Sequence, residues 1–136
     1  MSGTMDAVVS AAWLAEHLDD HDLVVLDSRV VMTASGTVGD RSGYLTGHIP
    51  GAVFADLPGR LSEPAAPIWF AVPAPSVLAA TLGDLGVGDR SRVVIYDARL
   101  ETPTGPVAGM WAARVWWMLR WLGFDEAAVL DGGLQS

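Results

Sequence analysis

The runs Leu23-Val24-Val25-Leu26-Asp27 and Val93-Val94-Ile95-Tyr96-Asp97 decide the fold class of this chain. Each run is short, almost wholly apolar and rich in β-branched residues, which is typical of a strand buried on both faces. Apolar spacing and helix-ending residues predict helices at 11–20, 76–85 and 110–122, and another apolar run predicts a strand at 127–130. Strands that alternate with helices predict an α/β fold, with a central parallel sheet and helices on both faces.

The segments between these elements are rich in turn-forming residues. We expect loops at 28–43 and 98–109, and a short strand at 52–54. Five prolines between residues 56 and 75 make a regular element there unfavourable. The 136 residues are enough for one domain, 1–136. Because an α/β domain usually adds a covering helix after its last strand, we expect the segment 133–136 to be a boundary or a cut.

The composition excludes several classes of protein. Eight basic residues, all of them arginine, stand against 16 acidic residues, so the formal net charge is −8. An acidic chain without a basic stripe repels nucleic acid and anionic membranes, so neither is an expected partner. No segment is typical of a signal peptide or a membrane span, and we expect a cytoplasmic protein. Cysteine is absent, which excludes disulfides and a cysteine nucleophile on this chain.

The candidate site residues follow the two central strands. Ligands of parallel sheets bind beyond the carboxyl ends of the strands, where Asp97, Arg29 and Arg99 are placed by the pattern. Asp97 is either a nucleophile of phosphoryl transfer or, as we favour, a hydrogen-bond acceptor for loop amides. The two arginines either hold a small anionic substrate or, as we favour, form ion pairs with neighbouring aspartate or glutamate.

Two further patterns also allow a functional and a structural interpretation. His17 and His21 have the four-residue spacing of helical metal ligands, but the aspartates around them favour a solvated helix end. The predicted helix at 110–122 holds four of the six tryptophans, and we favour burial in the core over a partner interface. We therefore predict no metal and no cofactor.

Four segments together resemble rhodanese-type sulfurtransferases. They are LVVLDSR (23–29), YLTGHIPGAVFADL (44–57), VVIYD (93–97) and AARVWWMLRWLGFDEAAVLDGGL (112–134). The resemblance spans nearly the whole chain. It is greatest to the first, non-catalytic domain of the tandem two-domain thiosulfate and 3-mercaptopyruvate sulfurtransferases.

The resemblance implies a rhodanese-like fold and a division of labour between two domains. In the family, a cysteine after the central strand carries sulfur as a persulfide, and Asp97 stands at that position here. The implied catalytic cysteine therefore belongs to a second domain, which would be this chain's partner. A small anionic sulfur donor would bind in the cleft between the domains.

Two roles remain open for the chain itself. In the first, it is the non-catalytic N-terminal half of a sulfurtransferase, with Arg29 and the loop 98–109 walling one side of the cleft. Replacing Arg29 by alanine should then weaken donor binding with little loss of stability. In the second, the chain is a stand-alone binding module without catalysis.

Overall fold

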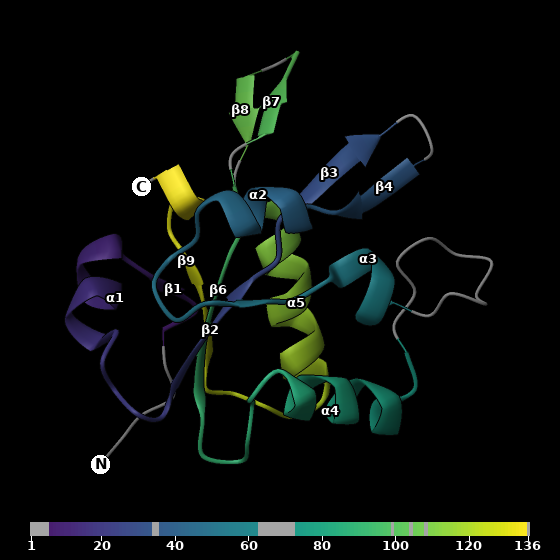
Figure 1. The fold of residues 1–136 in the computed structure, drawn as a ribbon. Helices are drawn as coiled ribbons and strands as arrows, with labels where there is room; N and C mark the ends of the chain where they lie inside the picture. Colours follow the sequence, from purple (N-terminus) through teal and green to yellow (C-terminus); the bar gives the residue numbers. More distant parts are fainter. Residues whose placement is uncertain are drawn as a thin grey trace.

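A five-stranded parallel sheet forms the centre of the domain (Figure 1). A computed structural model describes residues 6–33, 36–62, 73–98, 100–103, 105–107 and 109–135. The sheet has the strand order β1-β9-β6-β2-β5, and every neighbouring pair is parallel. Its strands are β1 (Val8–Val9), β2 (Leu23–Asp27), β5 (Val53–Phe54), β6 (Arg92–Tyr96) and β9 (Ala127–Leu130). The predicted α/β architecture with a central parallel sheet is confirmed.

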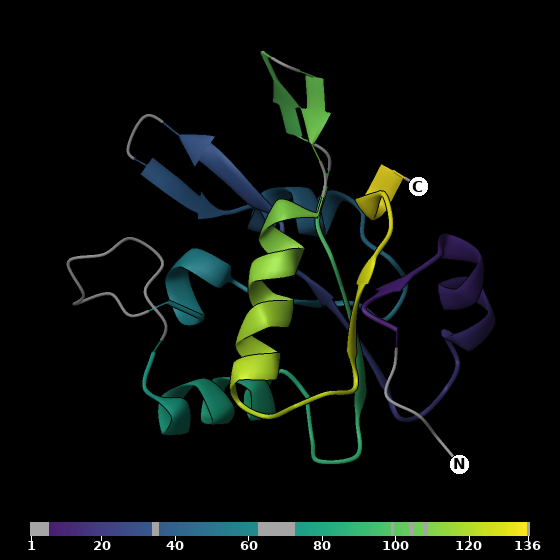
Figure 2. The same cartoon turned by 180° about the vertical axis from the view of Figure 1, so that it is seen from behind.

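Helices cover both faces of the sheet, as predicted. On one face, Val93 and Ile95 of β6 share a core with α3 (Leu57–Arg60), α4 (Pro75–Asp84) and α5 (Met110–Trp121). On the other face, Val94 and Tyr96 pack in a second core with α1 (Ala11–His17). Successive side chains of a strand point to opposite faces, so the apolar run of β6 supplies both cores. Figure 2 shows α5 on the first face, running alongside β9.

The two predicted loops each contain a hairpin, which corrects the sequence analysis. Strands β3 (Val30–Thr33) and β4 (Gly36–Gly39) pair antiparallel within 28–43, followed by the short helix α2 (Arg41–Thr46). Strands β7 (Leu100–Thr102) and β8 (Gly105–Val107) pair within 98–109. Both hairpins project from the body beyond the carboxyl ends of the strands (Figure 1). Glycines in β4 and β8 obscure the alternation by which such strands are recognised.

The tryptophans of α5 divide between the core and the surface. Trp111 and Trp116 pack against the first core, and the Trp116 indole N–H donates to the carbonyl of Ala127. Trp117 and Trp121 are 44% and 47% exposed, and their rings stack 6.4 Å apart between centroids. The expectation of core burial therefore holds for only part of this group. Among the described helices, none is long and apolar enough to cross a membrane.

Candidate functional site

The carboxylate of Asp97 caps the N-terminus of α5 from another element. Asp97 follows β6 and is 1% exposed. Its Oδ1 accepts a hydrogen bond from the Gly109 amide at 2.8 Å, and its Oδ2 accepts from the amides of Trp111 and Ala112 at 3.0 and 3.1 Å. Gly109 is the capping residue of α5 but has no side chain to cap with, and its φ of 91° is left-handed. The three first-turn amides are thus satisfied by a carboxylate that the fold brings from β6.

This arrangement fills a site that would otherwise suit an anion. Free amides and the helix dipole at a helix N-terminus attract phosphate, carboxylate or thiolate groups. Here the negative charge is part of the protein, and it is buried with the amides that bind it. An external anion would have to displace Asp97 to reach these donors.

A second buried carboxylate, Asp27, ends the neighbouring strand β2. Asp27 is 0% exposed, and the Arg29 guanidinium contacts it through Nε at 2.9 Å and Nη2 at 2.8 Å. The backbone amide of Arg29 also donates to Asp27, at 3.0 Å. The Tyr96 hydroxyl adds a further hydrogen bond to Asp27, at 2.8 Å. Asp27 therefore has both a charged partner and neutral donors.

The same cluster holds the segment that follows α2. Arg29 Nη2 donates to the carbonyl of Gly47 at 2.8 Å, and the Ile49 amide donates to the Tyr96 hydroxyl at 3.2 Å. Burial raises the pKa of Tyr96 well above its ordinary value, and the nearby Asp27 carboxylate adds to this effect. Tyr96 therefore stays protonated and bridges Asp27 to the backbone of Ile49.

The position of Arg29 changes one expectation. Arg29 is 6% exposed and is engaged by Asp27 and Gly47, which is the ion pair that the sequence analysis favoured. Removing it would leave the Asp27 carboxylate buried without its cation, and breaking a buried pair is strongly destabilising. The expected small effect of Arg29→Ala on stability is therefore replaced by an expected large one. Its place on a substrate cleft stays a prediction.

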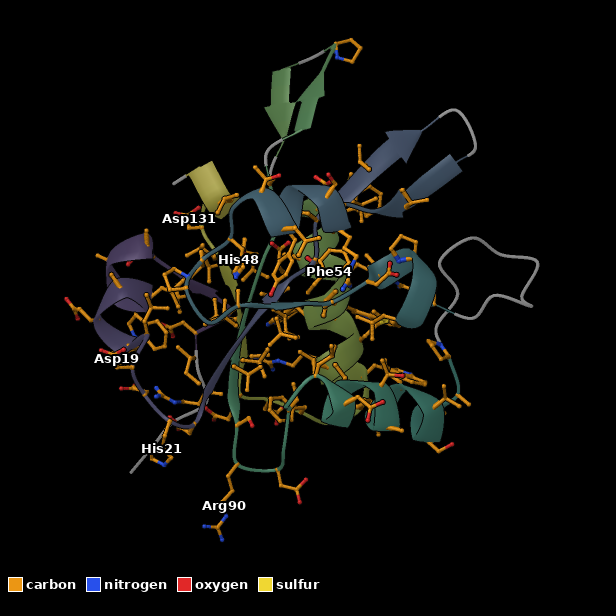
Figure 3. All side chains as sticks on the ribbon, viewed as in Figure 1. Asp19, His21, His48, Phe54, Arg90 and Asp131 are labelled. Atoms are coloured by element: carbon orange, nitrogen blue, oxygen red, sulfur yellow. The ribbon has the colours of Figure 1, made fainter. Side chains whose placement is uncertain are left out.

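The remaining candidates do not join this cluster. Arg99 lies outside the described residues. His17 stacks on Trp13, and its Nδ1 lies 2.6 Å from the Trp13 carbonyl. Figure 3 shows His21 at the lower left of the molecule and His48 apart from it, near the middle of the view beside α2. Within the described residues, no group of three or more histidine, aspartate or glutamate side chains is placed to hold a metal ion.

Sequence reasoning missed Tyr96 and the backbone of the segment 47–49. A tyrosine at the end of a buried strand needs a partner for its hydroxyl, and that signal was available in VVIYD.

A hollow of about 360 Å³ between the C-terminal parts of α4 and α5 is separate from the cluster of Asp27, Arg29 and Tyr96. Its lining includes Val87–Asp89 and Phe124, which precede β6 and β9, so it lies toward the amino ends of these strands.

Comparisons with known proteins agree with the fold. The model of the rhodanese-like domain family matches residues 10–136. The 3-mercaptopyruvate sulfurtransferase of Escherichia coli (strain K12) is 36% identical over 126 residues, which are 93% of this chain and 42% of that protein. A probable 3-mercaptopyruvate sulfurtransferase of Pseudomonas aeruginosa is 41% identical over 133 residues, 95% of this chain and 43% of that protein.

A solved structure gives the same result. The crystal structure of a 3-mercaptopyruvate sulfotransferase from Escherichia coli matches with a TM-score of 0.78 and 34% identity, covering 96% of this chain and 47% of that chain. This chain thus spans less than half the length of these relatives. The resemblance predicted from the four sequence segments is confirmed. The chain belongs to the rhodanese-like domain family and is similar to the 3-mercaptopyruvate sulfurtransferases.

Proposed function

We propose that this chain is the non-catalytic N-terminal domain of a two-domain sulfurtransferase. The complete enzyme would move sulfur from thiosulfate or 3-mercaptopyruvate to a thiophilic acceptor, carrying it as the sulfane sulfur of a persulfide on a cysteine of the second domain. The observation that carries the proposal is the Asp97 carboxylate, bound by the three amides at the start of α5.

The chemistry of that helix end supports a non-catalytic role. Amides at a helix N-terminus stabilise a thiolate, and by the same physics a persulfide anion. In this chain they bind a carboxylate, which cannot carry sulfur as a persulfide, and the 136 residues contain no cysteine. A domain of this fold without the sulfur-carrying group is best explained as the partner of a domain that has one.

The role left to this chain is to support and shape the cleft. The carboxyl ends of β2 and β6 carry the Asp27–Arg29–Tyr96 cluster, which fixes the backbone of Gly47 and Ile49 beside them. Rigid backbone at this edge would form one wall of the cleft in which a small anionic donor binds. Arg29 would act there by holding this wall through its hydrogen bond to the carbonyl of Gly47.

The test measures sulfur transfer from thiosulfate to cyanide and from 3-mercaptopyruvate to a thiol, with the complete gene product and with the 136-residue chain alone. We expect activity only from the complete product. Replacing the cysteine of the second domain should abolish that activity. The Asp97→Asn variant should keep a sulfur-transfer activity of at least the same order of magnitude as the unsubstituted enzyme. Loss of activity in Asp97→Asn, with the fold intact by circular dichroism, would contradict the non-catalytic role.

Asp97→Cys in the isolated chain asks whether the carboxylate is the only obstacle to sulfur binding. If the new thiolate occupies the amides, it can attack the sulfane sulfur of thiosulfate, so that the S–S bond breaks and sulfite leaves. Intact mass spectrometry would then show the gain of one sulfur atom. We expect little or no gain, because the segment 98–109 is longer and richer in proline than an active-site loop of the family. A gene product with neither a second domain nor activity would favour the stand-alone binding module.

A further inference from the structure

The outward face of α5 is apolar and aromatic, whereas the outward face of a surface helix is usually polar. Met110, Trp117 and Trp121 each expose nearly half of their surface. They recur at i, i+7 and i+11, a spacing that places them in one row along the helix, which we call the outer stripe of α5. In Figure 2, α5 is the element nearest the viewer, and no described helix or strand passes in front of it.

The charges on α5 are all positive, and they are engaged within the domain. The helix carries two arginines and no aspartate or glutamate, although the chain has 16 acidic residues. The Arg114 guanidinium lies 5.0 Å from the centre of the Trp117 ring, and the Arg120 guanidinium lies 4.9 Å from that of the Trp116 ring. Arg120 also pairs with Asp125 at 3.8 Å. Because both charges have partners, the outer stripe does not require an acidic ligand.

The outer stripe has the composition of an interface centre. Tryptophan, methionine and arginine are enriched there, and tryptophan and arginine contribute most of the binding energy. The rings of Trp117 and Trp121 stack on each other, so their positions are largely set before any partner arrives. Binding to side chains that are already ordered costs less conformational entropy.

We propose that the outer stripe of α5 binds the same stripe of a second copy of the protein, with the two helices antiparallel about a twofold axis. With a net charge of −8, two copies of this domain repel each other through most of their surfaces. The α5 helix offers a face without a single acidic residue, so two copies can approach there at low electrostatic cost. The inference does not depend on the proposed function.

The sequence of α5 is self-complementary in this arrangement. A twofold contact brings residue i of one copy to residue j of the other, and residue j to residue i. When the helices pair about Val115, Trp117 of each copy lies level with the small, exposed Ala113 of the other. Met110 then lies nearly level with Trp121, so apolar side chains also cover the ends of the stripe. A large side chain thus faces a small one at the centre of the contact.

Sedimentation velocity of the complete gene product measures the association. We expect a reversible dimer with a Kd of about 10 μM, because a contact made by one pair of helices is small. Trp117→Glu places a charge at the centre of the stripe and should raise the Kd by about thirtyfold or more. Ala12→Glu is the control, since it adds the same charge to an exposed residue of α1, on the other face of the sheet. It should leave the Kd unchanged.

A second substitution guards against a folding defect. Trp121→Glu alters the end of the stripe rather than its centre and should also weaken the dimer. Circular dichroism of each variant verifies that the fold is kept. A dimer that Trp117→Glu and Trp121→Glu leave intact, or that Ala12→Glu weakens equally, would overturn the proposal.

Photo-cross-linking identifies what the stripe contacts. The residue p-benzoylphenylalanine replaces Trp117 in the complete gene product, and copies labelled with a heavy isotope are mixed with unlabelled copies before irradiation. We expect mass spectrometry to find peptides that join position 117 of one copy to the segment 110–121 of another. Such peptides combine a labelled half with an unlabelled half, which distinguishes them from cross-links within one molecule.

The remaining outcomes point to other occupants of the stripe. Cross-links confined to one molecule would show that another part of the same polypeptide covers α5. A monomer at every concentration would show that the stripe serves a different partner or none. Either result would overturn the proposal, whether or not the gene product transfers sulfur.

Discussion

Asp27 and Asp97 are two buried aspartates at the ends of adjacent strands, and the protein neutralises them in different ways. Asp27 is bound mainly by side chains, the Arg29 guanidinium and the Tyr96 hydroxyl. Asp97 is bound by backbone amides of the α5 N-terminus. Side-chain partners have to be encoded residue by residue, whereas helix amides are offered by almost any sequence that forms the helix. The first site is therefore particular to these residues, and the second is a general anion site filled by one carboxylate.

The largest expected effect comes from Asp27→Asn. The substitution leaves the Arg29 guanidinium buried without its counter-charge, and breaking such a pair costs about 3 to 5 kcal/mol. Urea denaturation measures the free energy of unfolding. Asp131→Asn is the matched control, since Asp131 also follows a strand, β9, but is exposed. A loss below about 1 kcal/mol in Asp27→Asn would show that Arg29 finds water or another partner.

Asp97→Asn should cost less, about 1.5 to 3 kcal/mol. The asparagine oxygen still accepts from the helix amides, but its NH₂ group faces at least one N–H donor, so charged hydrogen bonds are lost. No buried cation is left behind, which is the difference from Asp27. Urea denaturation measures this decrease in the free energy of unfolding. A decrease equal to that of Asp27→Asn would show that side-chain and backbone partners stabilise the two carboxylates equally.

Tyr96→Phe should cost about 1 to 2 kcal/mol at neutral pH, because the Asp27 carboxylate and the Ile49 amide each lose one partner. The pH dependence gives a sharper measurement. Since the pKa of Tyr96 is raised by folding, its contribution is complete below the unfolded pKa of about 10 and is lost as the pH rises further. Unfolding free energies at pH 8 and pH 11 should differ less in Tyr96→Phe than in the unsubstituted chain. An equal difference in both would show that Tyr96 is not responsible for the alkaline loss.

The smallest effect is expected at Asp22, a carboxylate that is only partly buried. The hydrogen bond from Arg92 lowers the pKa of Asp22, so its contribution is present at neutral pH and is lost as the pH falls below about 4. In Asp22→Asn the free energy of unfolding should therefore decrease less on acidification than in the unsubstituted chain. At pH 7 it should change little. If Asp22→Asn lowered the free energy of unfolding at pH 7 as much as Asp97→Asn does, the difference in burial between the two aspartates would not determine their contributions to stability.

The parts of the fold that were predicted are those with local signals. The apolar runs of β2, β6 and β9 and the helical spacing of α1, α4 and α5 are visible without knowledge of distant contacts. The hairpins were not predicted, because β4 reads Gly-Thr-Val-Gly, and its partner strand is held by contacts that the sequence does not display. Trp117 and Trp121 are exposed, although core burial was predicted for them because a helix that is apolar almost all round is usually buried on more than one side.

The candidate site was located from the sequence but not explained by it. Asp97 was placed at a strand end, yet its donors are 12 to 15 residues further along the chain. Tyr96 and Asp27 are 69 residues apart, and only the pairing of β2 with β6 brings them together. Partners that depend on sheet register cannot be assigned before the register is known.

The parallel pairing of β1 with β9 has a consequence for how the protein is made. Val8 is the register partner of Val129, so an edge strand of the sheet joins residues that are almost the whole chain apart. Contacts of such high sequence separation form late and slow folding. On the ribosome, strand β1 leaves the exit tunnel before β9 and has no partner in the sheet until β9 has been synthesised. The nascent domain therefore exposes the unpaired strand β1 until the rest of its sheet has been synthesised, which is the period in which a chaperone would protect it from aggregation.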